Sequence, residues 1–191
     1  MKDTILSDIN KNITIENQSY HQNFIELEIT SSKLTKIDFT NSTFQYLEIN
    51  DSQVLDSNFS NLDIKGQSFF HTTFINCNFV GTNFSGAFLK EVTFQNCNLS
   101  YSNFSLSTIE NTTFTSCNLL DSSFAKAKNK KFYLQDCNLE KVDFFETVLK
   151  GVDIRSCNIN QIRIDIPSLK GLIVNEEQAL ALSKFLEIEI K

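Results

Sequence analysis

The sequence predicts an all-β fold, a parallel β-helix whose coil has four sides, closed at its C-terminal end by a short helix. Two observations carry this prediction. Large apolar residues recur every five residues from Phe24 to Ile164, at 28 of 29 positions, and 13 of the 18 Phe lie on this count. The cysteines recur every 20 residues, in the stretches NCNF, NCNL, SCNL, DCNL and SCNI, at Cys77, Cys97, Cys117, Cys137 and Cys157.

A period of five residues fits neither regular element. On an α-helix, apolar residues spaced by five would move around the axis, and on a straight strand they would alternate between the two faces. The remaining solution is a chain that turns a corner every five residues and points one apolar centre inward from each side. The cysteines recur at every fourth centre, so 20 residues complete one circuit. Gene duplication without this geometry is the alternative interpretation of the spacing.

Stacked coils explain which residues accompany the apolar centres. Repeats that cannot bury an apolar face alone do so by stacking, and a rise of about 4.8 Å per coil makes the predicted seven coils of residues 22–166 a rod roughly 34 Å long. Four large centres fill a narrow tube, so the second inward residue of each side must be small. We therefore expect five buried, unreactive thiols beside a stacked core ladder that includes Phe84, Phe104 and Phe124. The Asn after each cysteine suits a corner or an amide ladder.

Composition narrows the possible functions. The net charge of −6 argues against direct nucleic-acid binding, which needs a basic surface. Residues 1–25 hold no apolar run of signal-peptide length, and no later segment approaches a membrane span. With no such signal, an odd number of cysteines indicates reduced thiols, so we expect a cytoplasmic protein without membrane contact.

The sequence offers no catalytic pattern, and it predicts neither an enzyme nor a bound cofactor. His21 and His71 are the only histidines, and neither lies near a nucleophile motif. No glycine-rich phosphate loop is present. Zinc needs four converging ligands, which five cysteines in single file do not provide, so no metal site of that kind is expected.

Acidic residues gather on one predicted side of the coil, the side whose centres include Ile29, Ile49 and Leu89. We call it the glutamate side. A rod with spaced carboxylates can imitate the phosphates of duplex DNA, although an ordinary solvated face is the alternative. The candidate partner-binding residues are Glu28, Glu48, Asp51, Glu91 and Glu110.

The stretch AKAKNKKF at residues 125–132 reverses the charge on this side and contains the one failed apolar centre, Asn129. Two interpretations stay open: a small bulge that contacts a partner, or a local defect kept soluble by lysines. The candidate residues are Lys126, Lys128, Asn129, Lys130 and Lys131.

The two ends of the chain are predicted to cap the coil. Residues 1–21 form an N-terminal cap segment, and residues 167–191 form a last strand at Leu172–Val174 followed by a helix with Asn175 as its N-cap. An apolar set on this segment could cover the open end of the coil, and could also join two copies as a homodimer. Its members are Ile173, Ala179, Leu182, Phe185 and Leu186.

The stretch CNFVGTNFSGAFLKEVTFQNCNLSYSNFSL resembles the pentapeptide-repeat family, whose members form right-handed quadrilateral β-helices. The C-terminal LKGLIVNEEQALALSKFLEIEI resembles the end of the quinolone-resistance (Qnr-like) pentapeptide proteins of Gram-positive bacteria. That resemblance implies a DNA mimic that binds DNA gyrase and topoisomerase IV, modulates or protects against quinolone action, and dimerises through its C-terminus.

The repeat here is unbroken, whereas Qnr-like proteins of Gram-negative origin carry one or two loops that serve protection of gyrase. The resemblance therefore leaves protection and inhibition of gyrase both open. A non-enzymatic scaffold that binds a different protein partner is the alternative function.

Overall fold

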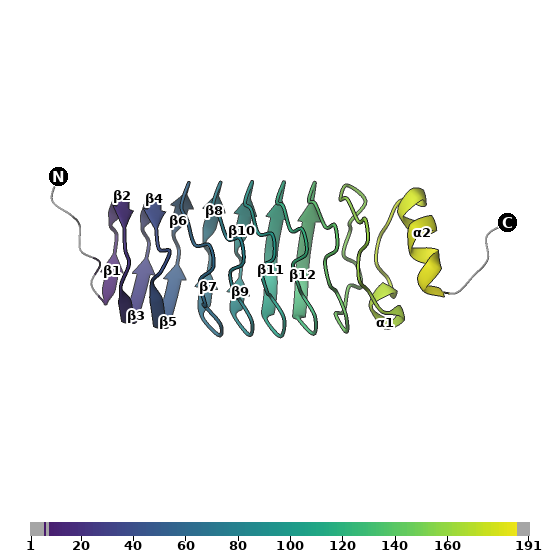
Figure 1. Ribbon diagram of the computed structural model, residues 1–191, viewed down its shortest axis with the longest axis horizontal. Helices are drawn as coiled ribbons and strands as arrows, with labels where there is room; N and C mark the ends of the chain where they lie inside the picture. The colour runs from purple at the N-terminus through teal and green to yellow at the C-terminus, as the bar shows by residue number, and fades with distance from the viewer. Residues whose placement is uncertain (1–5, 7, 187–191) are drawn as a thin grey trace.

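The chain winds into a straight four-sided rod of stacked coils, with β1 and α2 at opposite ends of the rod (Figure 1). The computed structural model describes residue 6 and residues 8–186. One parallel sheet of 12 strands runs along the rod in the order β1-β3-β5-β7-β9-β11-β10-β8-β6-β4-β2, with β12 paired to β11. The predicted parallel β-solenoid is confirmed.

The strands lie on adjoining sides of the coil. The odd-numbered strands of the first five coils stack on one side and the even-numbered strands on the next, and β11 and β12 each run through the corner between them. The strands are β1 Ile9–Lys11, β2 Thr14–Ser19, β3 Asn23–Thr30, β4 Lys33–Asp38, β5 Thr43–Asn50, β6 Gln53–Leu55, β7 Ser68–Phe70, β8 Thr73–Ile75, β9 Phe88–Lys90, β10 Thr93–Gln95, β11 Thr108–Thr115 and β12 Lys128–Gln135. The helices are α1 Ile166–Leu169 and α2 Glu176–Ser183, and a 3-10 turn follows at Lys184–Leu186.

Pairing between coils confirms the predicted length of the circuit. Phe24 pairs with Phe44, and Phe94 pairs with both Phe74 and Phe114. The other two sides are joined by single parallel bridges such as Asn78 to Asn98. Corners fall two residues after a centre, where the backbone takes a positive φ, as at Asn76 with 54° and Asp121 with 56°. Asn and Asp tolerate this left-handed conformation better than most residues, so the coil needs few glycines.

The inward residues form a dry core of stacked rings. Phe84, Phe104 and Phe124 are fully buried, and their ring centroids lie 4.5 and 4.8 Å apart in a parallel stack. Phe94 and Phe114 from another side meet this stack edge-on. Both arrangements are favourable for aromatic pairs.

The first coil begins before the predicted boundary at residue 22. Here β1 and β2 pair with β3 and β4 in a circuit that is one residue shorter than the later ones, as Ile9 with Glu28 and Thr14 with Lys33. The core residues Tyr20 and Phe24 are accordingly separated by one residue less in the sequence than two regular centres. A count of five that starts at Phe24 therefore misses Tyr20. The segment predicted as a cap therefore contributes a coil between residues 9 and 19.

The coil register also continues past the predicted end at residue 166. The partly buried Leu169, in α1, lies one full circuit after the centre Leu149, and Ile173 pairs with Asp153. This pairing is a single bridge, so the strand predicted at residues 172–174 is reduced to one position. The short helix α1 takes the place of the strand on its side of the last coil. The parts of the predicted end segments at residues 1–5, 7 and 187–191 lie outside the described residues.

Candidate partner-binding surface

The glutamate side begins with two stacked carboxylates. Glu28 on β3 lies directly beside Glu48 on β5 in the parallel register, and neither forms an ion pair within the described residues. The Tyr46 hydroxyl donates a hydrogen bond of 2.9 Å to Glu48 Oε2. That bond, followed by partial burial and the charges of Glu48, Glu28 and Glu26, raises the pKa of Tyr46 to about 12.

Further along, the acidic residues lie beside His71 and Lys130. Asp51, His71 and Glu91 are successive corner residues, and His71 lies between the two carboxylates, with Nδ1 3.3 Å from Asp51 and Nε2 3.5 Å from Glu91. Lys130 Nζ lies 3.3 Å from Glu110 Oε1. Glu28, Glu48 and Glu110 therefore lie on one side, with Asp51 and Glu91 at its corner. Of these five acids, only Glu28 and Glu48 have no Lys, Arg or His partner within the described residues.

The net charge of the chain is also unevenly distributed along the sequence. Residues 1–60 contain nine Asp and Glu against four Lys and Arg, which accounts for −5 of the net charge of −6. The rest of the chain is close to neutral. The negative potential of the rod is therefore concentrated in its first coils, a feature that the charge pattern of the glutamate side alone did not reveal.

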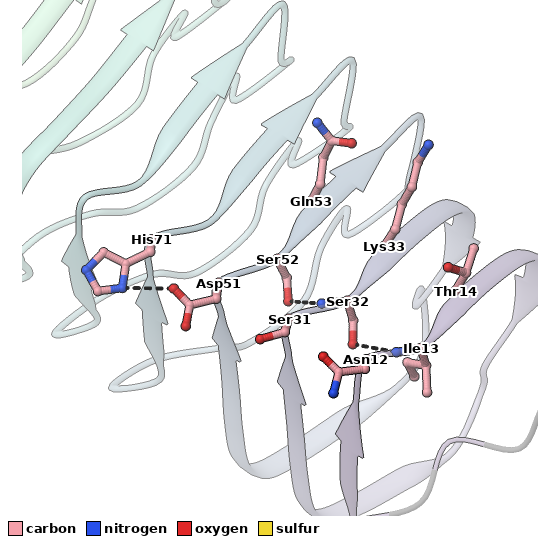
Figure 2. Close-up of a pocket in the computed structure, with 10 residues that line it drawn as sticks. All are labelled: Asn12, Ile13, Thr14, Ser31, Ser32, Lys33, Asp51, Ser52, Gln53 and His71. Atoms are coloured by element: carbon pink, nitrogen blue, oxygen red, sulfur yellow. Dashed lines mark hydrogen bonds and ion pairs between the residues drawn. The ribbon is translucent and has the colours of Figure 1, made fainter.

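A shallow polar groove runs along the corner beside these coils (Figure 2). It has a volume of about 570 Å³ and is lined by hydroxyl, amide and charged side chains from four successive coils. The Ser32 hydroxyl accepts from the Ile13 N–H at 3.2 Å, and the Ser52 hydroxyl accepts from the Ser32 N–H at 3.1 Å. The groove is solvent-facing and polar, so it extends the surface that a partner could contact near Asp51.

The lysine-rich stretch is a regular coil, and the predicted bulge is absent there. Lys128 to Gln135 form β12, which pairs with β11 without interruption, as Lys128 with Thr108 and Asn129 with Ile109. Asn129 Nδ2 donates to the Val148 carbonyl at 2.6 Å. Phe132 occupies the inward position that Thr112 fills one coil earlier, and its ring contacts Phe114, Phe124 and Phe144. A large side chain at the usually small position thus fills the space that the failed centre leaves.

The C-terminal segment covers the end of the coil. Asn175 accepts from the Gln178 N–H at 2.9 Å while its own N–H donates to Gln178 Oε1, a complete capping box. Gln178 Nε2 donates to the carbonyls of Ile154 and Cys157, so the helix satisfies backbone groups at the end of the rod. Leu182 is buried and Phe185 packs against the core, whereas Ile173, Ala179 and Leu186 face solvent.

The asparagines beside the cysteines form an amide ladder. Asn138 Nδ2 donates to Asn118 Oδ1 at 2.9 Å, and Asn158 repeats the contact with Asn138. Their Oδ1 atoms also accept from the backbone N–H two residues later, as Asn118 from Leu120. The asparagines lie within a side and not at the corner, and their amide bonds add to the backbone bonds that join this side from coil to coil, as Asn118 N–H to the Cys97 carbonyl.

The five thiols are free and buried, one above another. At Cys137, the hydrogen bond to Cys117 raises the pKa, the contact with Cys157 lowers it, and burial brings it to about 12. The hydrogen bond to Cys137 followed by burial raises the pKa of Cys157 as well. At Cys97 and Cys117, the thiol of the next coil lowers the pKa. The thiol of the previous coil and burial have a larger combined effect, and they raise the pKa of both cysteines to about 12. Only Cys77, which accepts from Cys97, has a lowered pKa.

Alkaline pH should therefore destabilise the fold. Above pH 9, the ordinary thiol value, the unfolded chain loses protons that Cys97, Cys117 and Cys137 keep in the folded state. Each such thiol removes on the order of 1 kcal/mol of unfolding free energy at one pH unit above its unfolded pKa. Urea unfolding with a reductant should show stability constant below pH 9 and falling towards pH 12. The triple variant Cys97→Ser, Cys117→Ser, Cys137→Ser should lose most of this decline; an unchanged decline would contradict it.

The other described residues carry no converging chemistry. Among them, no three His, Cys, Asp or Glu side chains gather as a metal site. The described helices include none with the length and hydrophobicity needed to cross a membrane.

Comparison with known proteins finds the same repeat. Residues 67–144 match the family described as pentapeptide repeat region. The plasmid-mediated fluoroquinolone resistance protein QnrB1 is 16% identical, with 94% of this chain and 99% of that chain covered and a TM-score of 0.42. HetL, a pentapeptide repeat protein involved in heterocyst differentiation regulation in the cyanobacterium Nostoc, is 12% identical over 87% of each chain, with a TM-score of 0.41. No curated protein matches the sequence significantly.

The fold is a parallel β-solenoid, and the part of it at residues 67–144 matches the pentapeptide repeat. The chain resembles the Qnr proteins and other pentapeptide-repeat proteins, as the sequence predicts. Its repeat runs without inserted loops from Phe24 through Ile164.

Proposed function

We propose that this protein binds the DNA-binding surface of DNA gyrase and topoisomerase IV as a partial mimic of duplex DNA, and that it thereby modulates quinolone action. The stacked pair Glu28 and Glu48 at the acidic end of the rod supports this proposal most directly. Pentapeptide-repeat proteins generally act as non-enzymatic scaffolds, and a cytoplasmic location would give this one access to both enzymes.

The spacing of the carboxylates sets the scale of the mimicry. Neighbouring coils repeat at about 4.8 Å, whereas duplex DNA carries one charge per ~1.7 Å of axis. The acidic surface therefore substitutes for a few phosphates and not for a long duplex. Contact with a basic surface of this kind should be rapid and sensitive to salt.

Neutralising the acidic end should weaken the effect on gyrase. In a supercoiling assay with and without ciprofloxacin, the variant Glu26→Gln, Glu28→Gln, Glu48→Gln should need roughly tenfold more protein for the same effect, because charge complementarity speeds association. Glu140→Gln, which removes an acid from a different side, is the matched control and should behave as the parent. Equal potency of the triple variant and the parent would count against the acidic contact, and no effect of the parent protein would refute the function.

A scaffold for another partner is the second candidate. It is favoured by the charge distribution, since the chain beyond residue 60 is close to neutral and Glu110 there is paired with Lys130. Affinity capture from the source cells separates the two functions. Recovery of topoisomerase subunits supports the first, and recovery of a different protein without them supports the scaffold.

The C-terminal end is proposed to pair with a second copy. An apolar depression of about 260 Å³ lies there, lined by Leu169, Leu172, Val174, Ala179, Leu182, Ser183 and Leu186. Leu180 nearby is 58% exposed. Two such ends pressed together would remove this apolar surface from water.

A charge at this end should therefore separate the copies. Leu180→Glu should change the mass measured by light scattering from dimer to monomer, because an unpaired carboxylate would be buried in the contact. Leu106→Glu, at a leucine of similar exposure in the middle of the rod, is the control and should stay dimeric. A parent protein that is monomeric at high micromolar concentration would contradict the proposed dimer.

A further inference from the structure

The cysteine column is a continuous file of metal-ligating atoms inside the rod. Bridges from Asn78 to Asn98 and onward to Asn158 hold the adjoining backbone in strict register from coil to coil. Successive cysteines therefore repeat at about 4.8 Å. Cys77 is 2% exposed and Cys157 is 7% exposed, so water is largely excluded from the whole file.

The sulfurs from Cys77 to Cys137 have the same surroundings. The thiol of Cys97 points toward the carbonyls of Phe74 and Gln95, at 3.5 and 3.4 Å, and Cys117 and Cys137 repeat these contacts one coil at a time. The column thus consists of equivalent positions, and each interior thiol lies between two others.

The geometry selects the coordination number. No three potential ligands among the described residues converge on one point, which excludes the tetrahedral zinc site already considered from the sequence. Two neighbouring sulfurs, in contrast, lie about 4.8 Å apart. A metal–thiolate bond is about 2.3 Å, so two collinear bonds span about 4.6 Å. Soft thiolates favour Cu(I), and Cu(I) and Ag(I) both accept two sulfur ligands in a line.

We propose that the cysteine column binds soft monovalent cations, Cu(I) or Ag(I), each in linear coordination between the sulfurs of adjacent coils. One thiol proton leaves for each ion bound, so one thiolate and one positive charge are added together. The occupied column stays neutral, which a buried site requires. No oxidation or reduction takes place. A thiolate sulfur does not bridge two ions on exactly opposite sides, so each ion uses its own pair of neighbouring sulfurs, and the five thiols hold two ions at a time.

One end of the column is reached from outside. Cys157 lines a cavity of about 270 Å³ between the last coil and α2, together with Asn175, Glu177 and Gln178. The cavity is polar, and Glu177 supplies a negative charge beside it. A cation can therefore meet Cys157 first and pass to the sulfurs below.

Two double variants with equal numbers of thiols test the proposal. The variant Cys77→Ser, Cys157→Ser keeps the three adjacent thiols Cys97, Cys117 and Cys137. The variant Cys97→Ser, Cys137→Ser keeps three thiols that lie two coils apart, about 9.6 Å at the rise of a parallel sheet. Serine already occupies this position one coil earlier, at Ser57, so both variants suit the fold. Silver nitrate in chloride-free buffer is the probe, followed by native mass spectrometry, proton release and circular dichroism.

The parent protein should bind up to two Ag(I) ions with one proton released per ion and an unchanged dichroism spectrum. The adjacent-thiol variant should bind one ion, and the separated-thiol variant should bind at least tenfold more weakly. Equal binding by the two variants would overturn the proposal. So would binding by the parent only as the spectrum of the coil is lost, or no binding by the parent at all.

Discussion

Replacing Phe104 with Asp is expected to unfold the rod. The ring is fully buried, stacked 4.5 Å from Phe84 and 4.8 Å from Phe124, and Phe94 and Phe114 lie against it edge-on. Truncating a buried Phe alone costs about 3–5 kcal/mol. A carboxylate in the same place adds the cost of an unpaired buried charge. The two together are comparable with the whole stability of a domain of this size.

The control for this variant lies two residues away. Leu106 is 60% exposed and occupies a corner with a φ of 61°. Asp tolerates such a backbone, so Leu106→Asp should stay folded with a similar urea midpoint. Circular dichroism and urea titration compare the two. A folded Phe104→Asp protein with the parent midpoint would mean that the five-residue register is wrong.

The second large effect concerns Phe132. Phe132→Thr, which copies the residue of the preceding coil, should lower the unfolding free energy by about 3–5 kcal/mol, because the buried ring packs against Phe114, Phe124 and Phe144. Asn129→Leu alone should also destabilise, since a regular centre beside Phe132 overfills the tube. The double variant restores the ordinary repeat of a large centre and a small neighbour.

A double-mutant cycle measures this compensation. The double variant should be more stable than the sum of the single changes predicts, by an interaction energy of about 1–3 kcal/mol. The comparison pair is Asn129→Leu with Phe104→Ala, whose residues belong to different coils. Its interaction energy should differ, because Phe104 does not occupy the small position of Asn129's coil. Additive effects of Asn129→Leu and Phe132→Thr would show that Phe132 does not compensate for Asn129.

The coil was predictable because its period is enforced at every side. An apolar centre every five residues has one geometric solution, so the burial of Phe79, Phe94 and Leu119 followed directly from the count. The helix cap was predictable for a local reason, since Asn175 and the two glutamates after it satisfy a helix N-terminus whatever lies beyond.

The exceptions arise where neighbouring coils adjust to one another. The shortened step from Tyr20 to Phe24 keeps both rings in the core, and their ring centroids lie 6.3 Å apart. A fixed period hides such a step. The role of Phe132 likewise depends on the absence of a large centre at Asn129, which is a contact between sides and not a feature of either residue alone.

The candidate surface was only partly predictable. Counting by side correctly placed Glu28 beside Glu48, because register alone decides which residues stack. The position of His71 between Asp51 and Glu91 depends on side-chain reach across a corner. Sequence patterns assign residues to sides, but they do not show which charges are neutralised.

Competition with DNA tests the central proposal most directly. Fluorescently labelled protein should bind purified gyrase in low salt, and linear duplex DNA should displace it in proportion to its own affinity for the enzyme. The Glu26→Gln, Glu28→Gln, Glu48→Gln variant should bind roughly tenfold more weakly under the same conditions. Binding that saturating duplex DNA leaves unchanged, or no binding at all, would contradict a DNA-mimicking rod.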